Sequence, residues 1–302
     1  MATKSKSRPG RKKQALAAEP LEVHRPPPTN SNGATPSNQE VLRRLYVLML
    51  KCRMLSERAE RLTAGRDPAA DHDFAIGHEA IVVGATLELG PQDTIAASPH
   101  NFAAQFVKGT RVEYLLSQPP HENGTQAGTA APLDPFSLGT GLALAHRLEK
   151  KRNVVVALCG SGDAASLDCH HDALKFAGIH KLPITYVLKS SSAFDLGSEK
   201  RNPALEGLSF MARDCGFPAI LVDGKDAVAV WRVAQESIYR ARNGAGPTLI
   251  ECETRFTQFE EPLAHLEHYM RKRGLWDDEW RLEAADRIEA EIAAAASAFG
   301  RG

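Results

Sequence analysis

A glycine-rich stretch directly after an apolar run contains the residues of this sequence best suited to hold a phosphate group. The run Val154–Leu158 is short and rich in β-branched residues, which is typical of a buried parallel strand. A pattern of helical spacing begins soon after the glycines. Because exposed backbone N–H groups and a helix N-terminus both favour negative charge, this strand–turn–helix unit predicts a phosphate site. The candidate binding residues are Gly160, Ser161, Gly162, Asp163 and Ala164.

Two other kinds of site are compatible with the same region. Asp168-Cys-His-His-Asp172 contains metal-ligating residue types, but adjacent residues on a helix point in different directions and zinc sites favour wider spacings. The spacing Gly160-x-Gly-x-x-Ala165 also fits a dinucleotide fingerprint. An NAD site would need an acidic residue after the next strand, whereas Lys189 and three serines there would suit a 2′-phosphate.

The composition limits the classes of function. The 302 residues are enough for one large domain or two small ones with an ample core. Lysine plus arginine and aspartate plus glutamate both total 37, so no global field would attract nucleic acid or a membrane surface. No apolar run approaches transmembrane length. The five cysteines are scattered and odd in number, which favours reduced thiols and a cytoplasmic protein.

Residues 1–36 differ in composition from the rest of the chain. They combine a basic cluster with Pro-rich and Ser/Asn/Gly-rich runs, so we expect a disordered tail. A transit peptide or a polyanion-binding arm is the alternative, although no convincing amphipathic face supports either. The folded domain is expected to occupy residues 37–302, beginning with a helix whose Ser37 and Glu40 have capping-box spacing.

The apolar patterns predict strands that alternate with helices from about residue 134 onward. We expect strands at 154–158, 184–188, 219–222 and 248–252, and helices at 77–87, 139–148, 167–179, 205–215, 227–242, 262–272 and 278–299. Such alternation implies right-handed crossovers and an α/β fold with a parallel sheet. The helix expected after Ser37 and the helices expected at 262–272 and 278–299 predict helical extensions at both ends of the domain.

Six segments carry recognisable patterns in a fixed order. They are Ile76-Gly-His-Glu-Ala-Ile-Val-Val-Gly84, the spacing from Asp93 to Gly109, Lys181-Leu-Pro-Ile-Thr-Tyr-Val187, Val222-Asp-Gly-Lys-Asp226, Gly246-Pro-Thr-Leu-Ile-Glu251, and Pro262-Leu-Ala-His-Leu266 with Arg273-Gly-Leu-Trp-Asp277. Together they resemble the alpha subunit of the thiamine-diphosphate-dependent 2-oxo acid dehydrogenases, the first-component family of pyruvate and acetoin dehydrogenases.

This resemblance implies a fold, a set of cofactors and a partner. The fold would be the thiamine-diphosphate-binding fold, a parallel sheet with helices on both faces. Thiamine diphosphate and Mg²⁺ would lie at an interface with a beta subunit, which supplies the activating carboxylate, so the protein would be an oligomer. The implied reaction is decarboxylation of a 2-oxo acid, followed by acyl transfer to the lipoyl group of an acyltransferase complex.

The sequence departs from the family's pattern where the metal would bind. The family's Gly-Asp-Gly falls on Gly160-Ser161-Gly162, so a serine replaces the aspartate. Counting back from Leu182-Pro183 reveals a one-residue insertion, and Asp163 could substitute only in a rebuilt turn. The family's Asn falls on Ser191 and its carbonyl ligand on Ala193. Because Mg²⁺ prefers charged, hard oxygen ligands, these changes predict impaired cofactor binding. The candidate metal ligands are Asp163, Ser191 and Ala193.

Other departures lie around the same predicted pocket. The family's Tyr-Arg pair falls on Pro99-His100, which makes His100 the candidate catalytic residue. The alternative is that His100 is a solvated side chain with no part in catalysis. The Gly-rich segment before Asp134 is shortened, and the loop that carries Gly-His-Ser is absent before Phe259. Two hypotheses follow: a working alpha subunit with a rebuilt metal site, or a non-catalytic homologue that keeps the fold and the partner surface.

Overall fold

The computed structural model describes seven segments of the chain. They are residues 38–63, 76–97, 101–112, 134–160, 167–191, 207–254 and 261–299. The expected tail at residues 1–36 lies outside the described residues, and so does Ser37 of the expected capping box.

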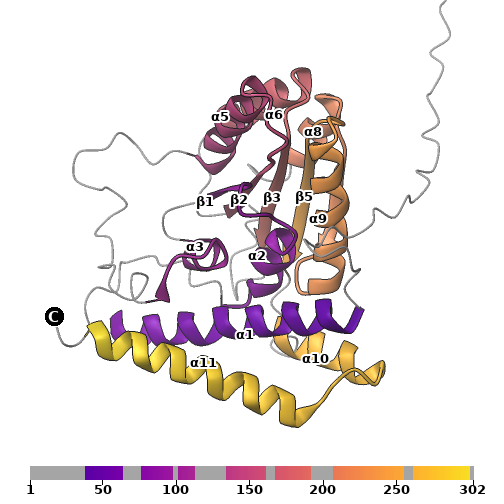
Figure 1. Ribbon diagram of the computed structural model, residues 1–302. Coiled ribbons are helices and arrows are strands. Elements are labelled where there is room, and N and C mark those ends of the chain that lie inside the picture. The colour runs from indigo at the N-terminus through magenta and orange to yellow at the C-terminus, as the bar shows by residue number, and fades with distance from the viewer. Residues whose placement is uncertain are drawn as a thin grey trace, which may run out of the picture.

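A parallel sheet occupies the centre of the described structure (Figure 1). Its strands are β1 (Thr94–Ala97), β2 (Val155–Gly160), β3 (Ile184–Ser191), β4 (Ala219–Asp223) and β5 (Thr248–Thr254). The strand order is β1-β2-β3-β5-β4, and every neighbouring pair is parallel. Parallel neighbours require long crossover connections, which the intervening helices supply. The predicted α/β fold is confirmed, and all carboxyl ends of the strands lie at one edge of the sheet.

Helices cover both faces of the sheet and form an additional layer of terminal helices. They are α1 (Asn38–Thr63), α2 (Glu79–Thr86), α3 (Phe102–Val107), α5 (Pro135–Leu148), α6 (Leu167–Ile179), α8 (Leu208–Asp214), α9 (Ala227–Arg242), α10 (Pro262–Lys272) and α11 (Asp278–Phe299). Successive strand residues point to opposite faces, so the fully buried β2 contributes to two cores. Val155 and Ala157 pack with residues of α5, α6 and α8, whereas Val156 and Leu158 pack with residues of α1, α2 and α9.

Gly139 allows α5 to approach the sheet closely. A Cβ atom at this position would meet the Cβ of Ala157 at 2.8 Å and the Cδ1 of Ile184 at 3.1 Å. Any larger residue would push the helix away from β2 and β3. Gly139 therefore allows the short distance between α5 and the sheet.

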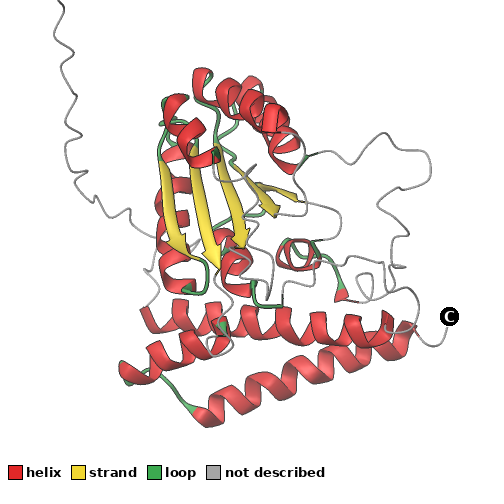
Figure 2. Ribbon diagram, turned by 180° about the vertical axis from the view of Figure 1, so that it is seen from behind, coloured by secondary structure: helices red, strands yellow, loops and turns green. Residues whose placement is uncertain are grey.

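The terminal helices form a separate layer, seen at the bottom of Figure 1 and from behind in Figure 2. α1 and α11 lie side by side and run in the same direction, because Tyr46 contacts Trp280 near the start of α11 and Lys51 binds Glu291 further along. The rings of Tyr46 and Trp276 meet edge to face, with their centroids 4.8 Å apart. The predicted helical extensions at both ends of the domain are thus confirmed.

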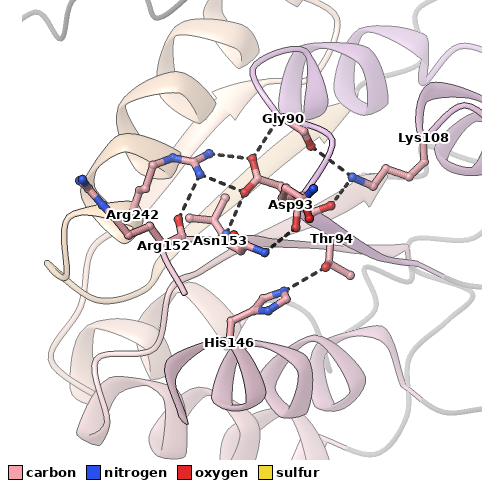
Figure 3. Close-up of polar contacts among 10 residues, drawn as sticks. Gly90, Asp93, Thr94, Lys108, His146, Arg152, Asn153 and Arg242 are labelled. Atoms are coloured by element: carbon pink, nitrogen blue, oxygen red, sulfur yellow. Dashed lines mark hydrogen bonds and ion pairs between the residues drawn. The ribbon is translucent and has the colours of Figure 1, made fainter. Parts of the chain in front are cut away.

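A partly buried ion pair joins the amino ends of β1 and β2 to the end of α9 (Figure 3). Arg242 donates to both carboxylate oxygens of Asp93, at 3.0 and 2.7 Å. The backbone N–H groups of Val154 and Gly90 donate to the same carboxylate, at 3.0 and 2.8 Å. Burial alone would raise the pKa of Asp93, but these four hydrogen bonds outweigh it and hold the pKa below its ordinary value. This ion pair lies at the edge opposite the predicted phosphate site.

Candidate functional site

The carboxyl edge of the sheet brings the two predicted parts of the phosphate site together. β2 ends at Gly160 and β3 ends at Ser191, and these strands are neighbours in which Gly160 lies opposite Lys189. α6 begins at Leu167, after the connection formed by residues 161–166. The strand, the turn and the helix therefore follow one another in the order that a phosphate site requires.

Two of the predicted site residues belong to described strands. Gly160 is buried at the last position of β2, and Ser191 ends β3 opposite Thr254 of β5. The other predicted residues lie outside the described segments: Ser161, Gly162, Asp163, Ala164, Ala193 and His100. Their roles in binding phosphate, metal or substrate stay predictions.

Next to Gly160, three buried side chains from separate elements converge. Asp134 caps the N-terminus of α5, Cys159 is the penultimate residue of β2, and His170 lies in the first turn of α6. One ligand atom of each residue lies within 4.8 Å of the other two. Asp134 Oδ1 and His170 Nε2 are 2.8 Å apart. These three residues, which we name the Asp134 cluster, connect α5, β2 and α6.

The carboxylate of Asp134 is held from two sides. Its Oδ2 accepts hydrogen bonds from the backbone N–H of Ser137, at 2.8 Å, and from the Ser137 hydroxyl, at 2.9 Å. Burial alone would raise the pKa of Asp134, but the hydrogen bonds from His170 and Ser137 hold it below its ordinary value. Asp134 is therefore ionised in the folded protein at neutral pH.

A second buried charge cluster lies on the other face of the sheet, between α1, α2 and α10. Glu79 is fully buried and accepts a hydrogen bond from Arg53 Nε, and Arg53 also donates to Glu261 at 2.8 Å. Burial alone would lower the pKa of Arg53, but the hydrogen bonds with Glu79 and Glu261 raise it above its ordinary value. Arg53 is therefore charged and balances the buried Glu79 carboxylate.

The sequence interpretation missed both clusters as units. Glu79 appeared only as part of the segment 76–84, and His170 only within the run 168–172. One signal was present, because an Asp directly before Pro135 with a Ser three positions after the Asp is typical of a capped helix N-terminus. Nothing in the sequence linked that cap to His170, which lies 36 positions away.

A cavity of about 760 Å³ lies away from both clusters. It is bounded by α1, α11 and the residues that lead into β1, with Arg43, Arg44 and Lys108 as its charged lining and Trp280 as its aromatic lining. Neither Gly160 nor any residue of the Asp134 cluster borders it. The candidate site at the carboxyl edge is therefore not this cavity.

Residues 46–258 match the family model described as "Dehydrogenase E1 component". The match covers more than half of the chain, and the chain belongs to this family. It is 28% identical over 229 residues to the alpha subunit of an acetoin:2,6-dichlorophenolindophenol oxidoreductase of Bacillus subtilis (strain 168), covering 70% of this chain and 68% of the relative.

Two further relatives carry the names of 2-oxo acid dehydrogenase subunits. The chain is 26% identical over 288 residues to the pyruvate dehydrogenase E1 component subunit alpha of Mycoplasma genitalium, covering 85% of this chain and 79% of the relative. It is also 26% identical over 293 residues to the 2-oxoisovalerate dehydrogenase subunit alpha of Bacillus subtilis (strain 168), covering 82% of this chain and 87% of the relative. The predicted resemblance to alpha subunits of this family is confirmed.

A solved structure shares the fold. Transketolase from Campylobacter jejuni subsp. jejuni NCTC 11168 superposes with a TM-score of 0.51 at 15% sequence identity, covering 84% of this chain and 47% of the transketolase. The chain thus spans about half the length of that enzyme, and the likeness concerns the fold alone. The predicted fold class, an α/β thiamine-diphosphate-binding fold, is confirmed.

Among the described residues, no helix combines the length and the apolar character that crossing a bilayer requires. Four described cysteines, Cys52, Cys159, Cys215 and Cys252, form no disulfide bond.

Proposed function

We propose that this chain is an alpha-type subunit of a thiamine-diphosphate-dependent 2-oxo acid dehydrogenase and that it pairs with a beta-type subunit in the cytoplasm. The observation that carries the proposal is the order of elements at the carboxyl edge, where β2 ends at Gly160 and α6 begins at Leu167. This order occurs in a chain that belongs to the dehydrogenase E1 component family. Acyl transfer to a lipoyl-bearing acyltransferase is part of the same proposal.

The diphosphate of the cofactor would be held mainly by the backbone. Residues 160–164 would supply N–H groups, and the N-terminus of α6 would supply the favourable end of the helix dipole. Bound thiamine diphosphate supplies the carbanion chemistry that decarboxylates a 2-oxo acid. The part of this chain would be to bind and orient the cofactor, while the activating carboxylate would come from the partner.

The metal that normally accompanies a diphosphate fits this chain poorly. Ser161 and Ser191 stand where the family has its aspartate and asparagine ligands, and Asp163 would supply the carboxylate that Mg²⁺ usually needs only in a rebuilt turn. Asp134 is a buried carboxylate near Gly160, but its Oδ1 lies 2.8 Å from His170 Nε2 and one of its oxygens lies within 4.8 Å of Cys159 Sγ, among nitrogen and sulfur donors that Mg²⁺ does not favour. It therefore does not replace the missing aspartate at position 161. We propose that Mg²⁺ contributes less to cofactor binding here than in a site that keeps the family's aspartate.

A second candidate function is a non-catalytic subunit that keeps the fold and the partner surface. It is favoured by the short connection between β5 and α10, in which only residues 255–261 separate Thr254 from Pro262. A segment this short leaves no room for the Gly-His-Ser loop that the family resemblance leads one to expect. A site without that loop would exclude water less well, and water exclusion is part of such catalysis.

Calorimetric titration of thiamine diphosphate into the chain purified with its beta-type subunit separates the two functions. The proposal predicts saturable binding that changes less than tenfold when Mg²⁺ is replaced by a chelator. Tight binding that is lost entirely without Mg²⁺ would contradict the impaired metal site. Absence of any binding in an intact complex would instead support the non-catalytic subunit.

The variant Ser161→Asp tests how much one carboxylate matters. We expect it to leave the dependence on Mg²⁺ nearly unchanged, because the inserted residue and the short β5–α10 connection remain. Recovery of strong metal dependence in this single variant would show that position 161 alone explains the weak site.

A further inference from the structure

The Asp134 cluster combines ligand types that bind a transition metal. We propose that Asp134, Cys159 and His170 bind one thiophilic divalent cation, with Zn²⁺ as the best match, at a site separate from the predicted diphosphate site. The three ligands come from a helix cap, a strand end and a helix first turn, so the sequence spacing does not reveal them. All three are more than nine-tenths buried, with exposed fractions of 7%, 0% and 1%.

The donor atoms select the kind of ion. A thiolate, an imidazole nitrogen and a carboxylate oxygen suit Zn²⁺, whereas Mg²⁺ and Ca²⁺ prefer oxygen ligands alone. One thiolate and one carboxylate carry two negative charges, which a divalent cation neutralises. A summed charge of zero for the cation and its ligands matters here, because an uncompensated charge is costly in a buried site. Three protein ligands leave the fourth position of a tetrahedral ion to water.

The surrounding groups already orient two of the ligands. Ser137 binds Oδ2 of Asp134 through its backbone N–H and its hydroxyl, which leaves Oδ1 directed at His170. The ring of Phe136 packs against the ring of His170, with centroids 5.3 Å apart. Such outer contacts are what fix the ligands of a metal site in position. The position of Oδ1 therefore requires little rearrangement for metal binding.

Metal binding would replace the short polar contact between His170 and Asp134. The present distance of 2.8 Å between Nε2 and Oδ1 is that of a hydrogen bond. The proton on Nε2 of His170 would move to Nδ1 as the neutral imidazole changes tautomer, and the thiol of Cys159 would lose its proton to solvent. Binding would thus strengthen as pH rises. A cation at this point would connect α5, β2 and α6.

Cobalt binding to the full-length chain tests the proposal. The chain is stripped with a chelator and titrated with Co²⁺, which reports thiolate ligation through a near-ultraviolet charge-transfer band. We expect one ion per chain, the band at equimolar metal, and its disappearance when Zn²⁺ is added. Cys159→Ser and His170→Gln are each expected to weaken binding more than tenfold. A chain that shows no such band overturns the proposal.

Two cysteine variants serve as controls. Cys252→Ser alters a buried cysteine of β5, and Cys169→Ser alters the residue next to His170 in the sequence. Both are expected to keep the band, and its loss in either would overturn the ligand assignment. Should Cys159→Ser fail to fold, X-ray absorption on the zinc-loaded unmodified chain decides. We expect one sulfur at about 2.3 Å with nitrogen and oxygen ligands at about 2.0–2.2 Å, and a shell without sulfur refutes the site.

Discussion

Arg242, in the last turn of α9, binds both carboxylate oxygens of Asp93, the residue directly before β1. The side chain of Asp93 is 2% exposed and that of Arg242 is 31% exposed. Bidentate pairs of this kind combine charge with fixed geometry, and removing one partner leaves the other charge buried. The contact ties a helix of one face to the first strand of the sheet.

Replacing the arginine should therefore destabilise the fold. For Arg242→Met we expect a loss of about 2–3 kcal/mol in the free energy of unfolding, below the value for a fully buried pair because the guanidinium is partly exposed. Urea denaturation measures the change. The matched control is Lys151→Met, which breaks an exposed pair with Glu149 and should cause no resolvable change. Equal effects of the two substitutions would contradict the role assigned to Arg242.

The same carboxylate should make stability depend on acid pH. The pKa of Asp93 is lower in the folded than in the unfolded chain, so its contribution is present above the unfolded value of about 4 and is lost as pH falls through the folded value. In Asp93→Asn that contribution is absent at every pH. We expect the variant to be less stable than the unmodified chain at pH 7. Between about pH 5 and about pH 2, a range that spans the unfolded pKa of Asp93, the variant should lose less stability than the unmodified chain. Parallel urea midpoints over this range would disprove the prediction.

Gly139 and Gly141 offer a comparison within one helix. Gly139→Ala would place a Cβ 2.8 Å from that of Ala157 and should cost about 1–3 kcal/mol through overpacking. Gly141→Ala meets nothing within 4 Å and should stabilise the chain by about 0.5–1 kcal/mol, since alanine favours a helix over glycine. Thermal unfolding monitored by circular dichroism measures both changes. A gain in stability for Gly139→Ala would show that α5 does not pack as closely as described.

Asp134 and Asp226 cap helices in the same way but differ in their second partner. Asp226 accepts from the backbone N–H groups of Val228 and Ala229, so Asp226→Ala should cost about 1 kcal/mol. Asp134→Ala removes a cap and also leaves the buried His170 unpaired, so we expect about 2–4 kcal/mol in chelator-treated protein. Chemical denaturation of both variants gives the difference. Similar losses for the two would mean that the contact with His170 contributes little.

The sequence predicted the longer elements well because their ends carry local signals. Asp226 caps α9 and Pro262 begins α10, and both helices begin and end at the predicted residues. β1 and α3 were not predicted, since four and six residues are too few to show a period. The strand before Gly160 was predicted one residue early at its start and two residues short at its end.

The candidate site was only partly predictable for a related reason. A glycine-rich turn between a strand and a helix is a local pattern, so Gly160 and the start of α6 could be placed from the sequence. The contact between His170 and Asp134 depends on how α6 packs against α5 on the sheet, which no local pattern encodes. Arg53 and Glu79 likewise meet only through the packing of α1 on α2.

The sheet separates the two buried charge clusters, because Asp134 and His170 lie with α5 and α6 on one face while Arg53 and Glu79 lie with α1 and α2 on the other. Side chains separated by a layer of packed strands share no partners, so the energetic effects of their substitution should add. Substitutions in the Asp134 cluster can therefore change what binds on one face of the sheet without weakening the contact between Arg53 and Glu79 on the other.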